Sequence, residues 1–243
     1  MFTMAGWMLP SRPRTLACAG SRLRAAGLKI PSTLSRYAWT MFALRLSKIL
    51  LVGIPLAITL SACASQPRQI NDVCAVFDQN DGWLSNWQRD ARAAERKHGV
   101  PVAILMATVR KESGFRQNAR PPRTKLLGVI PWKHQSTAYG YSQALDGTWT
   151  QYKAETGNFA ARRTSFGDAI DFVGWYHSKS SATLGIARND TYNLYLAYYL
   201  GWGGYKRGDW QSNAPIRKYA RSTDEMARDY AAQMRQCRAG GSA

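Results

Sequence analysis

The N-terminal part of this 243-residue chain lacks acidic residues. Residues 1–62 contain eight lysines and arginines but no aspartate or glutamate, and all 15 acidic residues follow Cys63. Residues 1–40 also lack a sustained hydrophobic period, so we expect them to form a disordered basic extension rather than a folded domain. A nucleic-acid-binding tail or a transit peptide would fit this composition. A simpler interpretation is that translation begins at Met41.

Long apolar runs are also missing. The run Ile49–Leu60 has 12 residues, fewer than the roughly 20 that a membrane-spanning helix needs. Because Arg45 and Lys48 precede this run and small residues follow it, we interpret residues 41–62 as a secretory signal peptide. Leu60-Ser61-Ala62-Cys63 resembles the bacterial lipobox. We therefore expect Cys63 to be lipidated; an ordinary secreted protein is the alternative.

Ala64, which follows the lipobox, resembles the residue found in lipoproteins that are sorted to the outer membrane. The expected location is thus the outer membrane of a Gram-negative bacterium, facing the periplasm, with acyl chains as the membrane anchor. Export also bears on the few cysteines, because the compartment is oxidising. With Cys18 in the extension and Cys63 lipidated, Cys74 and Cys237 are left to form a disulfide that joins the two ends of the domain.

Without residues 1–62 the chain has 25 basic and 15 acidic residues, a net charge of +10. Such a charge favours a polyanionic partner, or it is a scattered basic surface without function. An exported protein without zinc-finger spacing or RNA-binding aromatic motifs is not expected to bind nucleic acid. Peptidoglycan, with its peptide carboxylates, is the polyanion of the periplasm. We expect a monomer without metal or cofactor, because the three histidines show no ligand spacing: His98, His134 and His177.

Strand-like segments are almost absent after the signal peptide, which predicts a mostly α fold. We expect a tether over residues 63–80, one domain over 81–237, and a disordered tail over 238–243. Helices are predicted at 83–97, 101–115, 147–155, from 165, at 191–200 and at 215–237, with a flexible glycine turn at 201–204. Arg116–Thr137 contains three prolines and is predicted to be an irregular flap with a hairpin piece near Lys125–Pro131. Its basic residues would suit the wall of a glycan cleft.

Glu112 is the candidate catalytic residue. It lies near the end of the helix that starts after Pro101 and stops at Gly114, on the stripe expected to face the core. Burial and the negative end of the helix dipole both disfavour its anion, so its pKa should rise. A carboxyl with a raised pKa is suited to general acid catalysis near neutral pH. A solvated glutamate at a helix end is the alternative.

Three aspartates that could assist Glu112 have structural interpretations. Asp146 is predicted to be the N-cap of the helix at 147–155. Asp168 follows Ser165 at capping-box spacing, and Asp171 should be a charge on the helix surface. The predicted helix at 191–200 contains four tyrosines, whose hydroxyls need polar partners such as a cleft supplies.

Three motifs, in order, resemble those of the SLT-type lytic transglycosylases of the lysozyme-like superfamily. Glu112-Ser113-Gly114-Phe115 is similar to the family's E-S-x-F, Gly140-Tyr141-Ser142-Gln143 to G-L-M-Q, and Ala197-Tyr198-Tyr199-Leu200-Gly201 to A-Y-N-x-G. Serine replaces the methionine, tyrosine replaces the asparagine, and the loop after the first motif is longer than the family's minimal pattern. The resemblance implies a single mostly α domain of goose-lysozyme type with a long active-site loop.

The resemblance also implies a reaction. In the family, the glutamate cleaves the β-1,4 bond between N-acetylmuramic acid and N-acetylglucosamine and forms a 1,6-anhydro product, so peptidoglycan is the expected partner. By position, Tyr198 should hydrogen-bond near Glu112, and Ser113 and Gln143 should contact the sugar. Tyr195 joins the candidates only because it shares a helical face with Tyr198; the remaining candidates for substrate binding are Gly140 and Tyr141. The alternatives are a hydrolytic muramidase of goose type and a non-catalytic wall-binding lipoprotein.

Overall fold

The computed structural model describes residues 66–79, 86–126 and 130–240. The predicted signal peptide, Cys63 and Trp83 lie outside this part of the chain. The described residues form seven helices and a two-stranded sheet, as the predicted mostly α class requires. None of these helices has the length and apolar character to span a membrane.

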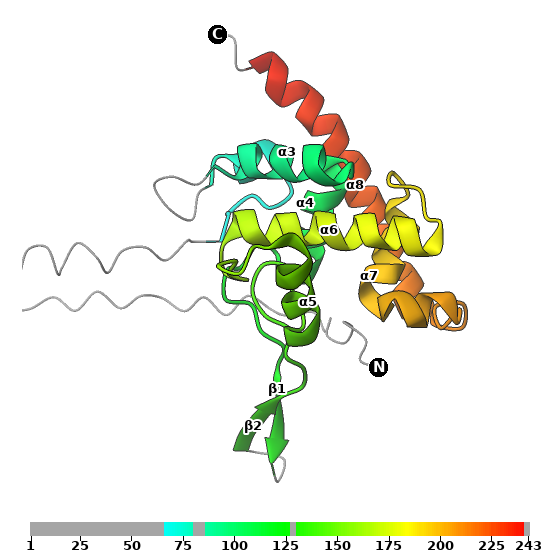
Figure 1. Cartoon of the computed structure of the whole chain (residues 1–243). Helices are drawn as coiled ribbons and strands as arrows, with labels where there is room; N and C mark the ends of the chain where they lie inside the picture. The colour runs from blue at the N-terminus through cyan, green and yellow to red at the C-terminus, as the bar shows by residue number, and fades with distance from the viewer. Residues whose placement is uncertain (1–65, 80–85, 127–129, 241–243) are drawn as a thin grey trace, which may run out of the picture. The chain divides into compact units, whose positions relative to one another are not determined.

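Helix α4 (Val102–Ser113) lies at the centre of the domain (Figure 1). All residues from Val102 to Val109 are buried, because α3, α6 and α8 all pack against this helix. A helix that is apolar all round belongs in a core rather than on a surface. Pro101 precedes the first turn, and Gly114 ends the helix in the left-handed conformation with φ 59°. The predicted start and stop signals are thus confirmed.

Helices α3 (Trp87–His98) and α6 (Phe166–Leu184) pack against each other beside α4. Trp87 and Phe166 stack across this contact with ring centroids 4.0 Å apart and an interplanar angle of 4°. The first turn of α6 is held by Ser165, whose hydroxyl accepts a hydrogen bond from the Asp168 amide. Asp168 in turn accepts from the Arg162 amide at 2.9 Å. The predicted N-cap at Ser165 is confirmed, whereas the Asp168 carboxylate accepts hydrogen bonds from the loop before α6 instead of from the Ser165 amide, which donates to the Arg162 carbonyl.

Helix α7 (Thr191–Lys206) bends at Gly201, which has φ 71° and ψ 161°. The sequence predicted a flexible turn from this glycine onward, but the chain resumes a helical path after it. The start of α7 is capped by Asp190, whose carboxylate accepts from the Asn193 amide. Helix α8 (Ala214–Gly240) packs along α4 and α7. It continues beyond residue 237, where the disordered tail was predicted to begin.

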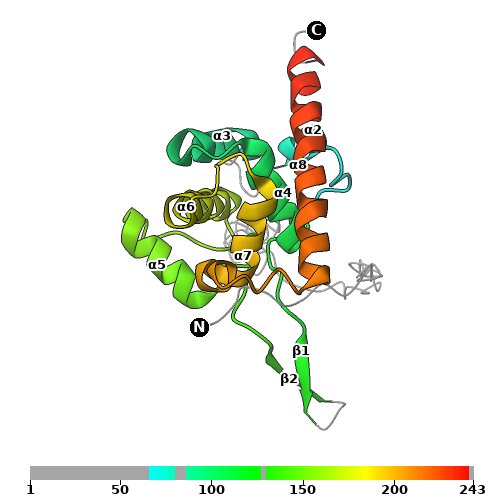
Figure 2. The same ribbon diagram turned by 90° about the vertical axis from the view of Figure 1, so that its right-hand side faces the viewer.

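A short helix, α2 (Val73–Phe77), lies in the segment predicted to be a tether. That prediction is wrong for these residues, because Val73 and Val76 are fully buried and α2 packs against α8 (Figure 2). The Val73 amide donates to the Gln233 side chain at 2.8 Å. Cys74 and Cys237 form the predicted disulfide, with Cα atoms 5.9 Å apart.

The long loop after α4 carries strands β1 (Arg123–Leu126) and β2 (Ile130–His134), which pair as an antiparallel hairpin. Both views show this hairpin projecting from the helical body, away from the C-terminal end of α8 (Figures 1 and 2). Two of the basic residues predicted for the cleft wall, Lys125 and Lys133, have side chains outside the described part. The loop then returns to α5 (Asp146–Thr156), which packs on α6.

Candidate active site

Glu112 lies in the last turn of α4, and part of the residue is exposed. Desolvation by the surrounding protein raises its pKa from 4.5 to about 7. A hydrogen bond from Tyr195 and the charge of Lys111 oppose this rise without cancelling it. Glu112 is therefore substantially protonated near neutral pH, as a general acid must be.

The hydroxyl that hydrogen-bonds to Glu112 belongs to Tyr195. Tyr198, which the sequence predicts to hydrogen-bond near Glu112, makes a different contact. Tyr198 is buried beside Glu112, but its hydroxyl donates to the Ser142 carbonyl at 2.6 Å. Burial and the nearby carboxylate raise the pKa of both tyrosines far above 10, so both hydroxyls keep their protons as donors.

A basic and aromatic surface borders Glu112 on the α8 side. The Lys111 ammonium lies 4.8 Å from the centre of the Tyr219 ring and donates to the Ser222 hydroxyl at 2.5 Å. Tyr219 is also in ring contact with Tyr199, whose pKa is raised by burial and by the charge of Glu112. Tyr219 lines a hollow of about 440 Å³ together with Ala214, Pro215, Lys218 and Arg221. An anionic group beside Glu112 would meet the two exposed cations of this hollow.

The second motif holds the loops that flank this site. Gly140 has φ 76°, and a Cβ at this position would lie 2.0 Å from the Arg163 carbonyl oxygen, so only glycine fits. The side-chain amide of Gln143 donates to the Ala119 carbonyl at 2.9 Å and to the Gly140 carbonyl at 2.8 Å. Tyr141 is fully buried with its ring edge-on to Trp87 at 5.5 Å. These contacts make the motif a scaffold; sugar contacts by these residues stay a prediction.

Two serines of the motifs are also buried. The Ser113 hydroxyl donates to the Val109 carbonyl at 3.1 Å, so its proton is used within α4 rather than offered to a sugar. The Ser142 hydroxyl, at the position where the family's motif has methionine, is buried and has no hydrogen-bond partner in the described part of the chain. A buried hydroxyl without a partner is destabilising.

Two of the predictions for aspartates need correction. Asp146 is the first residue of α5 rather than its N-cap; Leu145 holds that position, and Asp146 pairs with Arg163 at 2.7 Å. The prediction of a surface charge at Asp171 is wrong. Its half-buried carboxylate accepts three hydrogen bonds of 2.7 to 2.9 Å, from Tyr152, Lys97 and His98. Although desolvation opposes them, these hydrogen bonds lower its pKa to about 2.

Because Asp146 and Asp171 bind these other side chains, neither is among the groups that act on the pKa of Glu112. The other groups that act on the pKa of Glu112 are a tyrosine and a lysine, and neither is a carboxylate or an arginine. An ordinary glycosidase needs a second carboxylate, either about 5 Å from the acid as nucleophile or farther away as base. In the described residues, no group of three or more His, Cys, Asp or Glu could hold a metal ion. The Glu112 carboxyl can donate one proton and later accept one.

A buried histidine lies behind the site. The Nε2 atom of His177 is 3.0 Å from the Thr108 hydroxyl, which itself donates to the Ile104 carbonyl. Because that hydroxyl has only one proton, it must accept from Nε2–H, and His177 is neutral with Nδ1 unprotonated. Burial lowers the pKa of His177 to about 3, so it adds no positive charge near Glu112. Its Nδ1 atom has no hydrogen-bond partner in the described structure.

Sequence reasoning missed several residues of the site. It gave no role to Tyr219, nor to Lys111, which directly precedes Glu112 in the sequence. No local pattern indicates that Tyr219 meets Lys111, because the two lie 108 positions apart. The contact depends on how α8 packs along α4.

Comparison with protein families shows a match to the transglycosylase SLT domain over residues 51–237. This match covers more than three quarters of the chain and ends at the disulfide cysteine of α8. It includes all three motifs of the site. Comparison with curated proteins finds no match.

Proposed function

Because this chain belongs to the transglycosylase SLT family, we propose that it is a peptidoglycan lytic transglycosylase in which Glu112 acts first as acid and then as base. The bond cleaved is the β-1,4 linkage from N-acetylmuramic acid to N-acetylglucosamine. The observation that carries the proposal is a carboxyl with a pKa of about 7, on which no second carboxylate of the described residues acts.

In the first step, the Glu112 proton moves to the glycosidic oxygen. The bond between that oxygen and C1 of the muramic sugar breaks, and its electron pair stays with the leaving oxygen. Positive charge develops at C1, next to a carboxylate that has just become negative. The Tyr195 hydroxyl stabilises this anion through its hydrogen bond, which strengthens as charge appears.

In the second step, the Glu112 carboxylate takes the proton of the muramic C6 hydroxyl, and the C6 oxygen bonds to C1. The product is a 1,6-anhydro sugar, no water is consumed, and Glu112 is protonated again. This route needs no second carboxylate because the nucleophile is part of the substrate. A pKa near 7 suits both steps, since the group must give up and regain a proton at the same pH.

The charge around the site supports an acidic glycan as substrate. Lys218 and Arg221 line the hollow that includes Tyr219, the ring in contact with Lys111, and they form no ion pair within the described residues. Stem peptides on the muramic sugar carry carboxylates that these cations would attract. We propose that Ser113, Gly140, Tyr141, Gln143 and Tyr198 shape the sugar site mainly by fixing the backbone, and that Tyr195 acts on Glu112 directly.

The proposal is tested by Glu112→Gln, assayed on purified peptidoglycan for release of soluble fragments and for sedimentation with the insoluble polymer. We expect turnover to fall by roughly 100-fold or more, as for loss of a general acid, while binding is retained. Glu225→Gln, an exposed change on α8, is the matched control and should keep full activity. Unchanged turnover in Glu112→Gln would overturn the role of Glu112 as the acid, and no turnover in the unaltered protein would favour the wall-binding alternative.

We also propose that the enzyme is a monomer anchored to the outer membrane, on its periplasmic side, through lipid on Cys63. The support is the signal peptide and lipobox pattern of residues 41–63. Cys63→Ala should move the protein from the membrane fraction to the soluble fraction of cells. Membrane association that persists in this variant would count against the anchor without affecting the catalytic proposal.

A further inference from the structure

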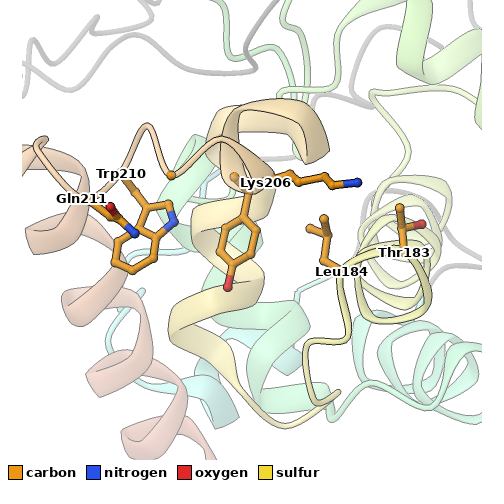
Figure 3. Close-up of a pocket in the computed structure, with 7 residues that line it drawn as sticks. Thr183, Leu184, Lys206, Trp210 and Gln211 are labelled. Atoms are coloured by element: carbon orange, nitrogen blue, oxygen red, sulfur yellow. The ribbon is translucent and has the colours of Figure 1, made fainter.

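A second cavity, of about 310 Å³, lies at the C-terminal end of α6, where α6 meets the second half of α7 and the loop before α8 (Figure 3). Its lining includes Thr183, Leu184, Tyr205, Lys206, Trp210 and Gln211. It shares no lining residue with the hollow that Tyr219 lines. Tyr205 and Trp210 nevertheless pack on the same hydrophobic cluster as Tyr195, so the two hollows lie on a common core.

Two aromatic rings form a fixed wall of this cavity. Tyr205 and Trp210 stack with centroids 6.1 Å apart and an interplanar angle of 22°. The Tyr205 hydroxyl donates to the Asn193 side chain at 2.9 Å, which fixes the ring and leaves its face as the contact surface. The Trp210 carbonyl accepts from Arg217 at 3.2 Å, so the loop that carries this ring is tied to α8. An aromatic wall held in place loses little entropy when a ligand binds.

Two polar side chains of the cavity, those of Lys206 and Gln211, can contact a ligand. Lys206 is exposed and makes no ion pair within the described structure, whereas its neighbour Arg207 pairs with Asp209 at 2.6 Å. Figure 3 shows the Lys206 side chain extended past Leu184, with the ammonium group on the Thr183 side. The Gln211 amide lies next to the Trp210 ring on the opposite side of the cavity (Figure 3). The cavity thus combines an aromatic face, one cation and one amide.

We propose that this cavity binds one sugar unit, with a carboxylate of the attached stem peptide, in a second segment of the same peptidoglycan, and holds the polymer without cleaving it. The inference rests on the proposed function for the identity of the polymer. The C–H face of a pyranose ring packs on aromatic rings, hydroxyl and acetamido groups bond to amides, and the carboxylate meets Lys206. The volume lies at the lower end for ligand sites and suits about one sugar unit.

The test measures sedimentation with insoluble peptidoglycan in the Glu112→Gln background, so that the polymer is not degraded. Lys206→Glu changes an exposed side chain and should weaken binding about 5-fold or more, because it turns attraction into repulsion. Trp210→Ala should weaken binding similarly, with its melting temperature as the check on folding. Arg96→Glu, the same charge reversal at an exposed position of α3, is the matched control and should change binding less than 2-fold. Equal effects of Lys206→Glu and Arg96→Glu would overturn the proposal.

A second measurement separates this proposal from the catalytic one. With Glu112 intact, Lys206→Glu should cleave a short soluble glycan of two disaccharide units at the unaltered rate, because such a substrate cannot occupy both sites. A parallel loss of turnover and sedimentation would place the cavity in the catalytic cleft and overturn a separate site. If the unaltered protein cleaves neither substrate, the proposed function fails, while the sedimentation result still decides whether the cavity binds the polymer.

Discussion

Glu112→Gln should stabilise the folded protein at alkaline pH and have no pH-dependent effect below about pH 4. The folded state holds the carboxyl at a pKa of about 7, against 4.5 for the unperturbed group. Between these values the unfolded chain has released the proton while the folded protein still binds it. The folded state thus binds more protons, and the free energy of unfolding falls as the pH rises.

The size of the effect follows from the interval between the two pKa values. Each pH unit within it changes the free energy of unfolding by about 1.4 kcal/mol, and the whole interval corresponds to about 3 kcal/mol. Because part of the Glu112 residue is exposed to solvent, we expect about 2 to 3 kcal/mol. This decrease in the free energy of unfolding is complete above pH 7 and absent below pH 4.5. Glutamine has no proton to release and avoids this loss.

Urea unfolding of both proteins with the disulfide intact, at several pH values from about 4 to 9, measures the difference. The advantage of the glutamine variant should grow between pH 4.5 and 7 and then stay constant. Glu225→Gln, at an exposed position of α8, should show no such pH dependence. A Glu112→Gln difference that is the same at every pH would refute the raised pKa and the argument for a proton donor.

Three further substitutions test the surroundings of the site. Tyr195→Phe removes a hydrogen bond to the Glu112 anion, which raises the pKa of Glu112. The alkaline decline of activity should therefore move up by about one pH unit. A pH–rate profile that keeps its position would contradict the contact. Gly140→Ala should lower the free energy of unfolding by roughly 3 kcal/mol or more, because its Cβ would overlap the Arg163 carbonyl. Gly147→Ala, in open space on α5, should instead raise it by up to about 1 kcal/mol. Equal urea midpoints for the two variants would contradict this prediction. Ser142→Ala removes a buried hydroxyl without a partner in the described part and should be neutral or stabilising by about 1 kcal/mol; a clear loss of stability would show that the hydroxyl is bonded.

Local signals predicted the central helix and its acid. Pro101 and Gly114 set the ends of α4, and the apolar residues between them require burial. A glutamate near the end of such a helix has to lie close to the core, so the direction of its pKa shift follows from its position. The N-cap at Ser165 is equally local and was equally predictable.

Contacts between distant segments could not be predicted in the same way. Asp171 was expected on the surface because nothing near it in the sequence binds it; its partners Lys97 and His98 come from α3. Likewise, Tyr195 and Tyr198 both lie on the inner face of α7, and only the packing of the second motif decides which hydroxyl reaches Glu112. The segment at Val73–Phe77 was taken for a tether because a five-residue helix carries little periodic signal.

The most direct test of the account is mass spectrometry of the muropeptides that the unaltered protein releases from purified peptidoglycan. A single carboxyl that uses the C6 hydroxyl of the substrate should leave 1,6-anhydromuramic ends, lighter by one water than the hydrolysis products. Reducing muramic ends would instead mean that water attacks C1, and Glu112 would then need a partner base that this account excludes.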